Sequence, residues 1–238
     1  MTVDRLRRRR SPRGSGEQLR AEILTAATDL LLESGDESAV SIRAVANRVG
    51  VTPPSIYIHF ADKDTLIDEV VAHYFTRLDE VMRQAGAEHD NTWEAAHAQG
   101  MAYVRFAVEN AELYRVATMK VCAEGTDADE VLSDSAFVHF AETIERLMDE
   151  GFVDKGDPTP VVMELWTAAH GVATLMIAKP YLPMGENYEL ADRVLTSVCL
   201  GRAIKDVIGG DVGPHEIRKF VLEQRAGLGS EPTPPIPG

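Results

Sequence analysis

The sequence predicts an all-helical fold for this chain of 238 residues, and three observations support the prediction. Apolar residues recur at intervals of three and four, as in Leu19, Ile23, Ala27 and Leu31, which is the period of an amphipathic helix. The alternating runs typical of strands are absent from the sequence, and only 6% of the residues are aromatic. A hydrophobic content of 45% in a chain of this length can bury a sizeable core, as one domain or as two smaller ones.

Residues 41–63 are the most informative segment, because they predict two short helices joined by a tight turn. Ile42, Val45 and Val49 recur at helical spacing, which places an apolar stripe on the inner side of the first helix. The Ser41 hydroxyl can accept a hydrogen bond from an amide of the first turn. We therefore expect Ser41 to be the N-cap of this helix.

The second helix is expected at residues 53–60, after a sharp reversal at Gly50. Thr52 is its predicted N-cap and Pro53 its first residue, a position that tolerates the missing amide hydrogen. A helix this short is unstable alone, so it must pack on its neighbours. Ile58 falls on its outer side, and an isoleucine there indicates that another molecule covers this surface.

The spacing of these residues resembles the DNA-binding helix-turn-helix of the TetR family of bacterial regulators, over about residues 17–70. The resemblance implies that Tyr57, His59 and Lys63 contact phosphates and that the first turn of the second helix meets base edges. Pro54 departs from the family pattern, since many members have glycine at this position, and two adjacent prolines remove two amide donors. The matching residues are Ser41, Val45, Ala46, Gly50, Val51, Ile56, Tyr57, Ile58, His59, Phe60 and Lys63.

Recognition of a base sequence is predicted to depend on Arg43, the nearby side chain that can bond guanine in a bidentate manner. The first turn offers two hydroxyls, while its prolines and Ile58 can pack only on thymine methyl groups, so DNA shape is expected to contribute. The tyrosine and the histidine could instead be structural, and Lys63 could pair with Asp62, although Asp62 is better explained as the cap of the next helix. The predicted DNA contacts are Ser41, Arg43, Thr52, Pro53, Pro54, Ser55, Tyr57, Ile58, His59 and Lys63, together with Arg7, Arg8, Arg9 and Arg10.

Charge is distributed unevenly along the chain. Residues 1–60 carry nine Arg and Lys against seven Asp and Glu, net +2, whereas residues 61–238 carry fifteen against thirty-one, net −16, within the total of −14. Phosphates respond to charge within about 8 Å at physiological salt, so the basic end is the part expected at DNA.

Residues 1–16 hold six arginines and are interpreted as a disordered basic arm, which either only solubilises the chain or follows the duplex into a narrow minor groove. No apolar run follows them, so no signal peptide is predicted and the protein is expected in the cytoplasm.

The remainder of the chain predicts a larger helical part. After a helix-turn-helix domain at residues 17–63, we expect a connecting helix at residues 64–85, a second domain at residues 92–225 and a disordered proline-rich tail at residues 226–238. Further helices are expected at residues 92–110, 113–123, 131–150, 158–179, 189–208 and 214–223, which makes about nine or ten in the whole chain.

Trp166, His170 and Gly171 resemble the Trp-His-Gly signature of a C-terminal domain that occurs in part of the TetR family. The resemblance implies that this half of the chain binds an effector and forms a dimer. The alternative is that Trp166 and His170 are ordinary core residues, with His170 bonded to a main-chain carbonyl. Gly171 is explained by a close approach of two helices.

A pocket for a hydrophobic small molecule is predicted from aromatic, methionine and histidine side chains, although such a stripe is more often plain core. The helices at residues 158–179 and 189–208 are expected to form a two-fold interface, because the second carries an apolar stripe that the remaining core cannot cover. The predicted pocket residues are Trp93, His97, Met101, Tyr103, Phe106, Tyr114, Met119, Phe137, Phe140, Trp166 and His170. The predicted interface residues are Val172, Leu175, Leu190, Val194, Val198 and Ala203.

An enzyme, a metal site and a cofactor are not predicted. The sequence lacks a glycine-rich phosphate loop, an HExxH motif and a nucleophile elbow. His139 and Glu142, one helical turn apart, could share a metal, but two such residues on one helix are common by chance. Cys122 and Cys199 are far apart in the sequence and are predicted to be reduced thiols, with redox sensing by Cys122 as an alternative.

The sequence therefore predicts a homodimeric, ligand-responsive, DNA-binding transcriptional regulator. Its expected partners are a near-palindromic double-stranded operator, a second copy of the chain and a small hydrophobic effector, with no membrane. By the resemblance, a repressor that the effector releases is the expected form. Two alternatives remain open: an architectural protein that tethers DNA as a dimer without an effector, and a small-molecule-binding protein whose motif has lost DNA binding.

Overall fold

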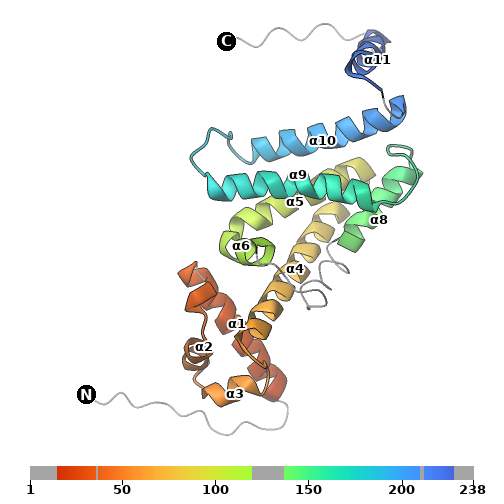
Figure 1. Ribbon diagram of the computed structural model, residues 1–238. Helices are drawn as coiled ribbons and strands as arrows, with labels where there is room; N and C mark the ends of the chain where they lie inside the picture. The colour runs from red at the N-terminus through yellow and green to blue at the C-terminus, as the bar shows by residue number, and fades with distance from the viewer. Residues whose placement is uncertain (1–14, 36, 120–136, 210–211, 228–238) are drawn as a thin grey trace.

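The fold is described from a computed structural model, for residues 15–35, 37–119, 137–209 and 212–227. In these residues all regular secondary structure is helical and no strand is present, so the all-helical prediction is confirmed (Figure 1). The first elements are α1 (Ser15–Ser34), the 3-10 turn η1 (Glu37–Ala39), α2 (Ile42–Val49), α3 (Pro53–Tyr57) and α4 (Lys63–Ala87). They are followed by α5 (Thr92–Glu109), α6 (Ala111–Met119), α8 (Phe137–Asp149), α9 (Thr159–Ala178), α10 (Glu189–Ile208) and α11 (Pro214–Gly227).

The helices α1, α2 and α3 form a small unit at the lower end of the molecule in Figure 1. Ile23 of α1, Val45 of α2, Ile56 of α3 and Phe60 just beyond it are fully buried in one core. The short α3 has few hydrogen bonds of its own, so this burial is what holds it in place. The tertiary contacts therefore supply the stability that the sequence of α3 lacks.

Local signals place the turn of this unit where the sequence predicts it. The Ser41 hydroxyl accepts a hydrogen bond from the Ala44 amide at 3.1 Å and caps α2. Gly50 ends α2 with φ at 78°, a left-handed conformation that a side chain would strain. Its amide donates to the Ala46 carbonyl at 3.0 Å, which completes the end of the helix before the reversal.

The long helix α4 connects the lower unit to the upper half of the molecule (Figure 1). Asp62 caps it as expected, because its carboxylate accepts from the Thr65 amide at 2.7 Å. Leu66 and Ile67 at its start are buried with α1, while Leu78 and Met82 near its end are buried among the upper helices. One rigid element therefore contributes to both hydrophobic regions.

In the upper half, α9 and α10 run antiparallel side by side and cover α5, which packs along α4 (Figure 1). α8 closes the group against α4, α5 and α9, and α6 fills the space between α4 and α1. α11 follows α10 and lies away from the body of the molecule (Figure 1). The core of this half is made by the buried faces of α4, α5, α6, α8, α9 and α10, with Tyr103, Tyr114, Ile144 and Leu195 among its largest side chains.

Several helix boundaries differ from those predicted. α3 ends at Tyr57 rather than at Phe60, and α4 extends to Ala87, across positions expected in a linker. α6 begins at Ala111 rather than at residue 113 and is described as far as Met119, so its predicted end at residue 123 lies outside the described residues. α11 continues past position 223 to Gly227.

α9 begins at Thr159, one residue later than predicted, and Pro158 occupies its N-cap position. The Asp157 carboxylate accepts from the Thr159 amide at 2.9 Å, and this bond lowers the pKa of Asp157.

Candidate functional sites

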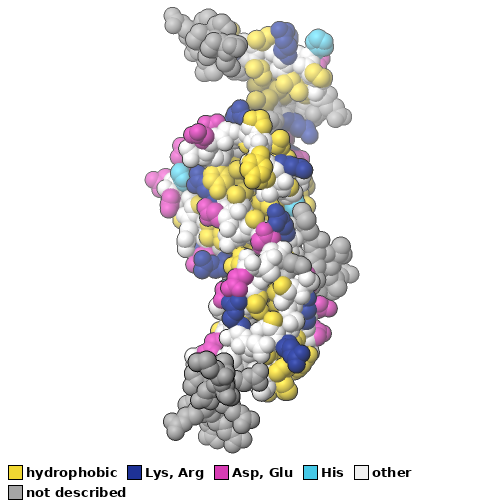
Figure 2. All heavy atoms as spheres, turned by 90° about the vertical axis from the view of Figure 1, so that its left-hand side faces the viewer, with side chains coloured by type: hydrophobic (Ala, Val, Ile, Leu, Met, Phe, Trp, Pro, Cys, Tyr) yellow, Lys and Arg dark blue, Asp and Glu magenta, His cyan; other side chains and the backbone are white. Residues whose placement is uncertain are grey.

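The surface predicted to contact DNA lies at the lower end of the molecule, on α3 and the start of α2. Tyr57 and Ile58 are 54% and 80% exposed, respectively, although both are large and mainly apolar. Arg43 and Thr52 are exposed as well, and His59 is half-buried. Figure 2 shows hydrophobic side chains at the surface of this lower end, beside basic ones. Tyr57 and Ile58 are thus available to another molecule, and a role for them inside the core is excluded.

The first turn of α3 is arranged differently from the prediction. Thr52 occupies the N-cap position with an extended backbone, but its side chain makes no capping hydrogen bond. Its Oγ1 lies 3.1 Å from Ser55 Oγ, so the two hydroxyls bond each other. The prediction that the Thr52 hydroxyl caps α3 is therefore wrong. Pro53 and Pro54 are both exposed between these hydroxyls and have no amide hydrogen to donate.

Lys63 is engaged inside the protein, contrary to the expectation that it is free at the first turn of α4. Its Nζ donates to the Glu37 carbonyl at 2.9 Å and lies 3.9 Å from the Glu37 carboxylate. Its neighbour Asp62 caps α4, as the sequence predicts. Lys63 ties η1 to the start of α4, and only its remaining N–H donors could contact phosphate.

Two further arginines of this unit have partners within it. Arg48 donates to the Glu33 carboxylate at 3.0 Å, and this bond raises the pKa of Arg48 and lowers that of Glu33. Arg20 lies over the Phe60 ring at 5.2 Å and pairs with Glu69 of α4. Both guanidinium groups therefore help to hold the unit together, and Arg20 links α1 directly to α4.

Some predictions lie outside the described residues. They concern the arginines of the N-terminal arm, the thiol that could sense redox state, one pocket side chain and the C-terminal tail. These are Arg7, Arg8, Arg9 and Arg10, Cys122, the Met119 side chain and residues 228–238.

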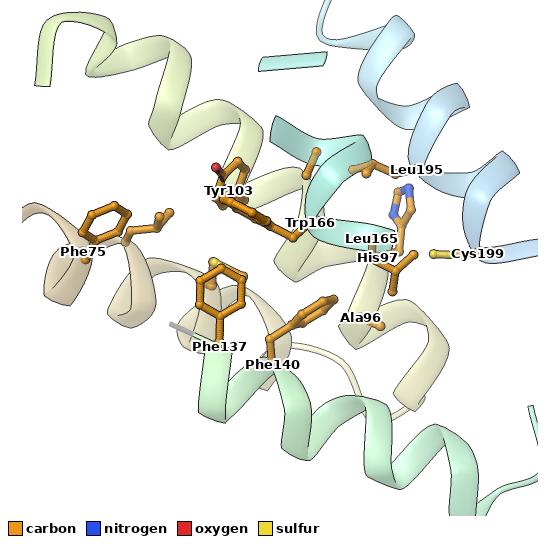
Figure 3. A pocket seen from close by; sticks show the side chains of 14 residues that line it. Phe75, Ala96, His97, Tyr103, Phe137, Phe140, Leu165, Trp166, Leu195 and Cys199 are labelled. Carbon is orange, nitrogen blue, oxygen red and sulfur yellow. Dashed lines mark hydrogen bonds between the residues drawn. The ribbon is translucent and has the colours of Figure 1, made fainter. Parts of the chain in front are cut away.

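A cavity of about 40 Å³ lies in the upper half of the molecule, between α4, α5, α8, α9 and α10 (Figure 3). Aromatic side chains from four of these helices project towards it, and small residues of α5 and α9 leave it room. Its lining consists of Phe75, Leu78, Met82, Ala96, His97, Gly100, Tyr103, Phe137, Phe140, Leu165, Trp166, Ala169, Leu195 and Cys199.

Part of the predicted pocket lines this cavity and part of it does not. The residues on the cavity wall are His97, Tyr103, Phe137, Phe140 and Trp166. The residues absent from the wall are Trp93, Met101, Phe106, Tyr114 and His170. Two of them pack on other aromatic rings: Trp93 lies against Phe152 with ring centroids 5.8 Å apart, and Phe106 lies against Tyr74 at 5.1 Å.

The sequence analysis missed the contribution of α4 to the cavity. Phe75, Leu78 and Met82 of α4 form one side of it, and Ala96 and Gly100 of α5 form another. Positions 75, 78 and 82 share one face of a helix, so this apolar stripe was a usable signal.

The Trp-His part of the signature belongs to a chain of hydrogen bonds. Trp166 Nε1 donates to the Tyr103 hydroxyl at 3.1 Å, and the Tyr103 and Tyr114 hydroxyls are 3.3 Å apart. The Tyr114 hydroxyl lies 2.6 Å from His170 Nδ1. The His170 ring is thus bonded to a tyrosine hydroxyl, and the alternative in which a main-chain carbonyl holds it is wrong.

Burial keeps the ionisable groups of this region uncharged. It raises the pKa of both Tyr103 and Tyr114 well above the ordinary tyrosine value, and it lowers the pKa of His170. Burial also raises the pKa of Cys199, a free cysteine, to about 11. The tyrosines and the thiol are therefore neutral at physiological pH.

The residues predicted for the dimer interface differ in how exposed they are, and Leu190 and Val198 pack partly against the core of their own protomer. Val172 is buried against the core of its own protomer, so its assignment to the interface is wrong. Leu175 is 40% exposed, whereas the predicted residues of α10 are half-buried. More exposed apolar side chains of α10 are Leu200 and Val207, at 47% and 64%. Gly171 is exposed and a Cβ added to it would meet nothing within 4 Å, so no close helix approach occurs there inside the protomer.

His139 does not face Glu142 in the way that a shared metal would require. Its Nδ1 lies 2.9 and 3.0 Å from the two carboxylate oxygens of Asp79, a buried residue of α4. This pair links α8 to α4 beside the cavity. Among the described residues, no three His, Cys, Asp or Glu side chains are grouped in a way that could hold a metal.

Comparison with known families gives two matches. The family model described as bacterial regulatory proteins of the tetR family matches residues 23–70, which include α2 and α3. The model described as the tetracyclin repressor-like C-terminal domain matches residues 96–198, which include most of the cavity wall. Each of the two halves of the chain thus has its own family match.

Similar proteins are bacterial. An uncharacterised HTH-type transcriptional regulator of Bacillus subtilis is 27% identical over 176 residues, which are 74% of this chain and 84% of that protein. An HTH-type transcriptional repressor of Mycobacterium tuberculosis is 44% identical over 71 residues, which are 30% of this chain and 37% of the repressor.

Two solved structures illustrate the shared fold. A protein of unknown function from Rhodococcus sp. RHA1 superposes with a TM-score of 0.67 and 24% identity, over 82% of this chain and 97% of its own. The fatty acid degradation regulator FadR from Bacillus halodurans superposes with a TM-score of 0.62 and 17% identity, over 76% and 98%.

Proposed function

Because the chain belongs to the TetR family of transcriptional regulators, we propose that it is a homodimeric repressor that a small apolar effector releases from a near-palindromic operator. The observation that carries this proposal is the position of α4. Its first turn is anchored at the helix-turn-helix unit through Lys63, and its later turns form one side of the cavity. A change at the cavity can therefore reach the DNA-binding surface through a single helix.

The exposed face of α3 is the proposed recognition surface. Tyr57 and Ile58 would otherwise expose apolar area to water, and a DNA duplex offers sugar and thymine methyl groups that can cover it. Arg43 supplies the guanidinium for a guanine, and the paired hydroxyls of Thr52 and Ser55 can bond a base edge or a phosphate. We also propose that the N-terminal arginines follow the duplex, since six positive charges there would strengthen binding to phosphates.

A second copy of the chain is the proposed partner of α9 and α10. The stretch of α9 is long and apolar enough to cross a membrane by composition, yet only 33% of it is buried in the protomer. Exposed Gly171 and Leu175 on α9, with Leu200 and Val207 on α10, would be covered if two copies packed across a two-fold axis. Such a dimer would place two recognition surfaces about 34 to 36 Å apart, one turn of the duplex.

The proposed release mechanism follows the connections of α4. Phe75, Leu78 and Met82 are in contact with the cavity, so a ligand that widens it displaces the upper part of α4. Glu69 of the same helix is paired with Arg20 of α1, so the displacement is passed to the lower unit. Two recognition surfaces that change their separation no longer fit successive grooves.

A band-shift titration tests this proposal. Duplexes from the region upstream of the protein's own reading frame are compared with scrambled duplexes at several salt concentrations, with and without apolar candidate compounds. Sequence-specific binding that a compound releases supports the repressor. Equal, salt-sensitive binding to all duplexes would favour the architectural dimer, and no binding at low salt would contradict a DNA-binding role.

A further inference from the structure

Among the residues that the structure describes, the wall of the cavity contains no unpaired charge, and we infer that its ligand is an uncharged, largely apolar molecule. This inference rests on the proposed function, because it takes the cavity to be the effector site. Of the fourteen lining residues, none is Lys, Arg, Asp or Glu, and His97 is the one that can carry a positive charge. The His97 Nε2 lies 3.1 Å from the Asp192 carboxylate and 3.3 Å from the Thr196 hydroxyl, so α10 already satisfies it.

The hydroxyl nearest to the cavity is also used within the protein. An indole N–H can only donate, so Trp166 Nε1 occupies a lone pair of the Tyr103 oxygen. A neutral His170 can accept the Tyr114 hydroxyl hydrogen at its Nδ1. The Tyr114 hydrogen is then used, so the Tyr114 oxygen acts as the acceptor for the Tyr103 hydroxyl. The Tyr103 hydrogen and one of its lone pairs are thus committed, and Figure 3 shows its oxygen at the edge of the lining. The Trp166 and His170 of the signature keep this part of the wall apolar.

A charged ligand would lose its hydration in this cavity without gaining a partner. Burial of an ion without a counter-charge is strongly unfavourable, whereas a neutral apolar molecule loses little on leaving water. The side chains that face the cavity are aromatic or aliphatic, with one methionine and one thiol, and burial keeps the Cys199 thiol protonated. A neutral aromatic or branched aliphatic compound therefore fits the wall, and its ionised analogue does not.

The cavity must enlarge to admit such a ligand, since about 40 Å³ is far below the roughly 300 Å³ or more of ligand-sized pockets. Phe137 and Trp166 pack edge to face with ring centroids 5.2 Å apart, and both are only half-buried. Met82 of α4 also lines the cavity, and its flexible side chain can change rotamer. Enlargement at these positions moves α8, α9 and α4, which is the displacement that the proposed release requires.

Two fluorescent probes with the same skeleton test the inference. N-phenyl-1-naphthylamine is neutral, and 8-anilino-1-naphthalenesulfonate adds one sulfonate to the same anilinonaphthalene. Each is titrated into the full chain and into Ala96→Val, in which two extra methyl groups enter the cavity wall. Ala102→Val is the matched control, because it makes the same change on α5 at a buried position that does not line the cavity. Circular dichroism first establishes that both variants keep the helical content of the native chain.

We expect the neutral probe to bind at least about tenfold more tightly than the sulfonate at the site that Ala96→Val blocks. Ala102→Val should leave both affinities within about threefold of the native values. If the sulfonate bound this site as tightly as the neutral probe, the inference would be overturned while the cavity remained a ligand site. Binding that ignores Ala96→Val, or no binding by either probe, would also overturn it. Failure of the proposed regulator is detected separately, as loss of DNA binding by the unliganded protein.

Discussion

At the level of single residues, Arg43 distinguishes sequence recognition from general DNA binding. It is exposed at the first turn of α2, whereas Arg48 is engaged with a carboxylate of α1 and Arg20 with a carboxylate of α4. We expect Arg43→Ala to weaken binding to the operator by roughly 1 to 3 kcal/mol and to affect scrambled DNA much less, because a bidentate guanine contact is lost. Fluorescence anisotropy at fixed salt measures both affinities.

Arg48→Ala is the matched control for this prediction. It removes the same charge from α2 but breaks an intramolecular pair with Glu33, so it should not change the preference for the operator. An equal loss of affinity of Arg43→Ala for operator and scrambled DNA would show that Arg43 contacts phosphate and does not recognise bases.

His170 makes the stability of the upper half dependent on pH. Burial lowers the pKa of the His170 ring from the ordinary histidine value of 6.5, and an Nδ1 that accepts from the Tyr114 hydroxyl also favours the neutral ring. The folded state therefore binds a proton less readily than the unfolded state. The contribution of the neutral His170 ring to the free energy of unfolding is complete above pH 6.5. It is lost as the pH falls from 6.5 towards the lowered pKa of the folded state.

We expect His170→Asn to remove this part of the pH dependence, since an asparagine can accept from Tyr114 without titrating. The free energy of unfolding is measured in urea from pH 5 to pH 8 for both proteins. The difference in free energy of unfolding between the native chain and His170→Asn should shrink as the pH falls below about 6.5. Parallel stability curves over this range would mean that the His170 ring is not held neutral by the fold.

At the level of elements, α4 is the helix on which the proposed coupling depends, and its N-cap is a direct point of attack. Asp62 accepts from both the amide and the hydroxyl of Thr65, at 2.7 and 2.9 Å. We expect Asp62→Ala to lower the free energy of unfolding by about 1 kcal/mol, because the first turn of α4 loses its cap. Asp62→Asn keeps a hydrogen-bond acceptor at the cap, so it should lower the free energy of unfolding less than Asp62→Ala does. Equal losses in the two variants, measured by urea unfolding, would contradict a capping role.

α3 shows why an element can be functional although its own sequence does not stabilise it. Its five residues begin with two prolines and lack a side-chain cap, and only Ile56 and the following Phe60 anchor it in the core. The outer residues are consequently free to be selected for contact with another molecule. A substitution at Ile58 should change DNA affinity more than stability, since the Ile58 side chain is 80% exposed.

At the level of the whole molecule, the exposed apolar side chains of α9 and α10 predict association. We expect Val207→Glu to weaken the proposed dimer at least about tenfold, because it introduces a charge that the partner would have to bury. Sedimentation velocity at a series of protein concentrations measures the association. Val138→Glu, the same change at an exposed position of α8, is the control and should leave it unchanged.

The Val207→Glu variant also tests whether binding to the full operator depends on the dimer. A monomeric Val207→Glu protein should bind a half-site as the native chain does and lose its advantage on the full operator. If the variant remained dimeric, the interface would have to lie on another surface. α11, which carries the exposed Ile217, Val221 and Leu222 and lies apart from the body in Figure 1, would be the next surface to test.

The sequence by itself determined the features that neighbouring residues encode. The helical class, the Ser41 and Asp62 caps and the left-handed turn at Gly50 each depend on residues within about four positions, so their patterns are visible in the chain. The exposure of Ile58 also followed from helical spacing alone.

Tertiary structure decided which distant side chains meet. Lys63 bonds Glu37 across 26 positions, Tyr114 bonds His170 across 56 positions, and Val172 faces its own core. Likewise, α4 supplies one wall of the cavity, while Trp93 and Phe106 are turned away from it. Periodicity predicts which face of a helix is buried, but the neighbour that covers it depends on how the helices are rotated and packed against one another.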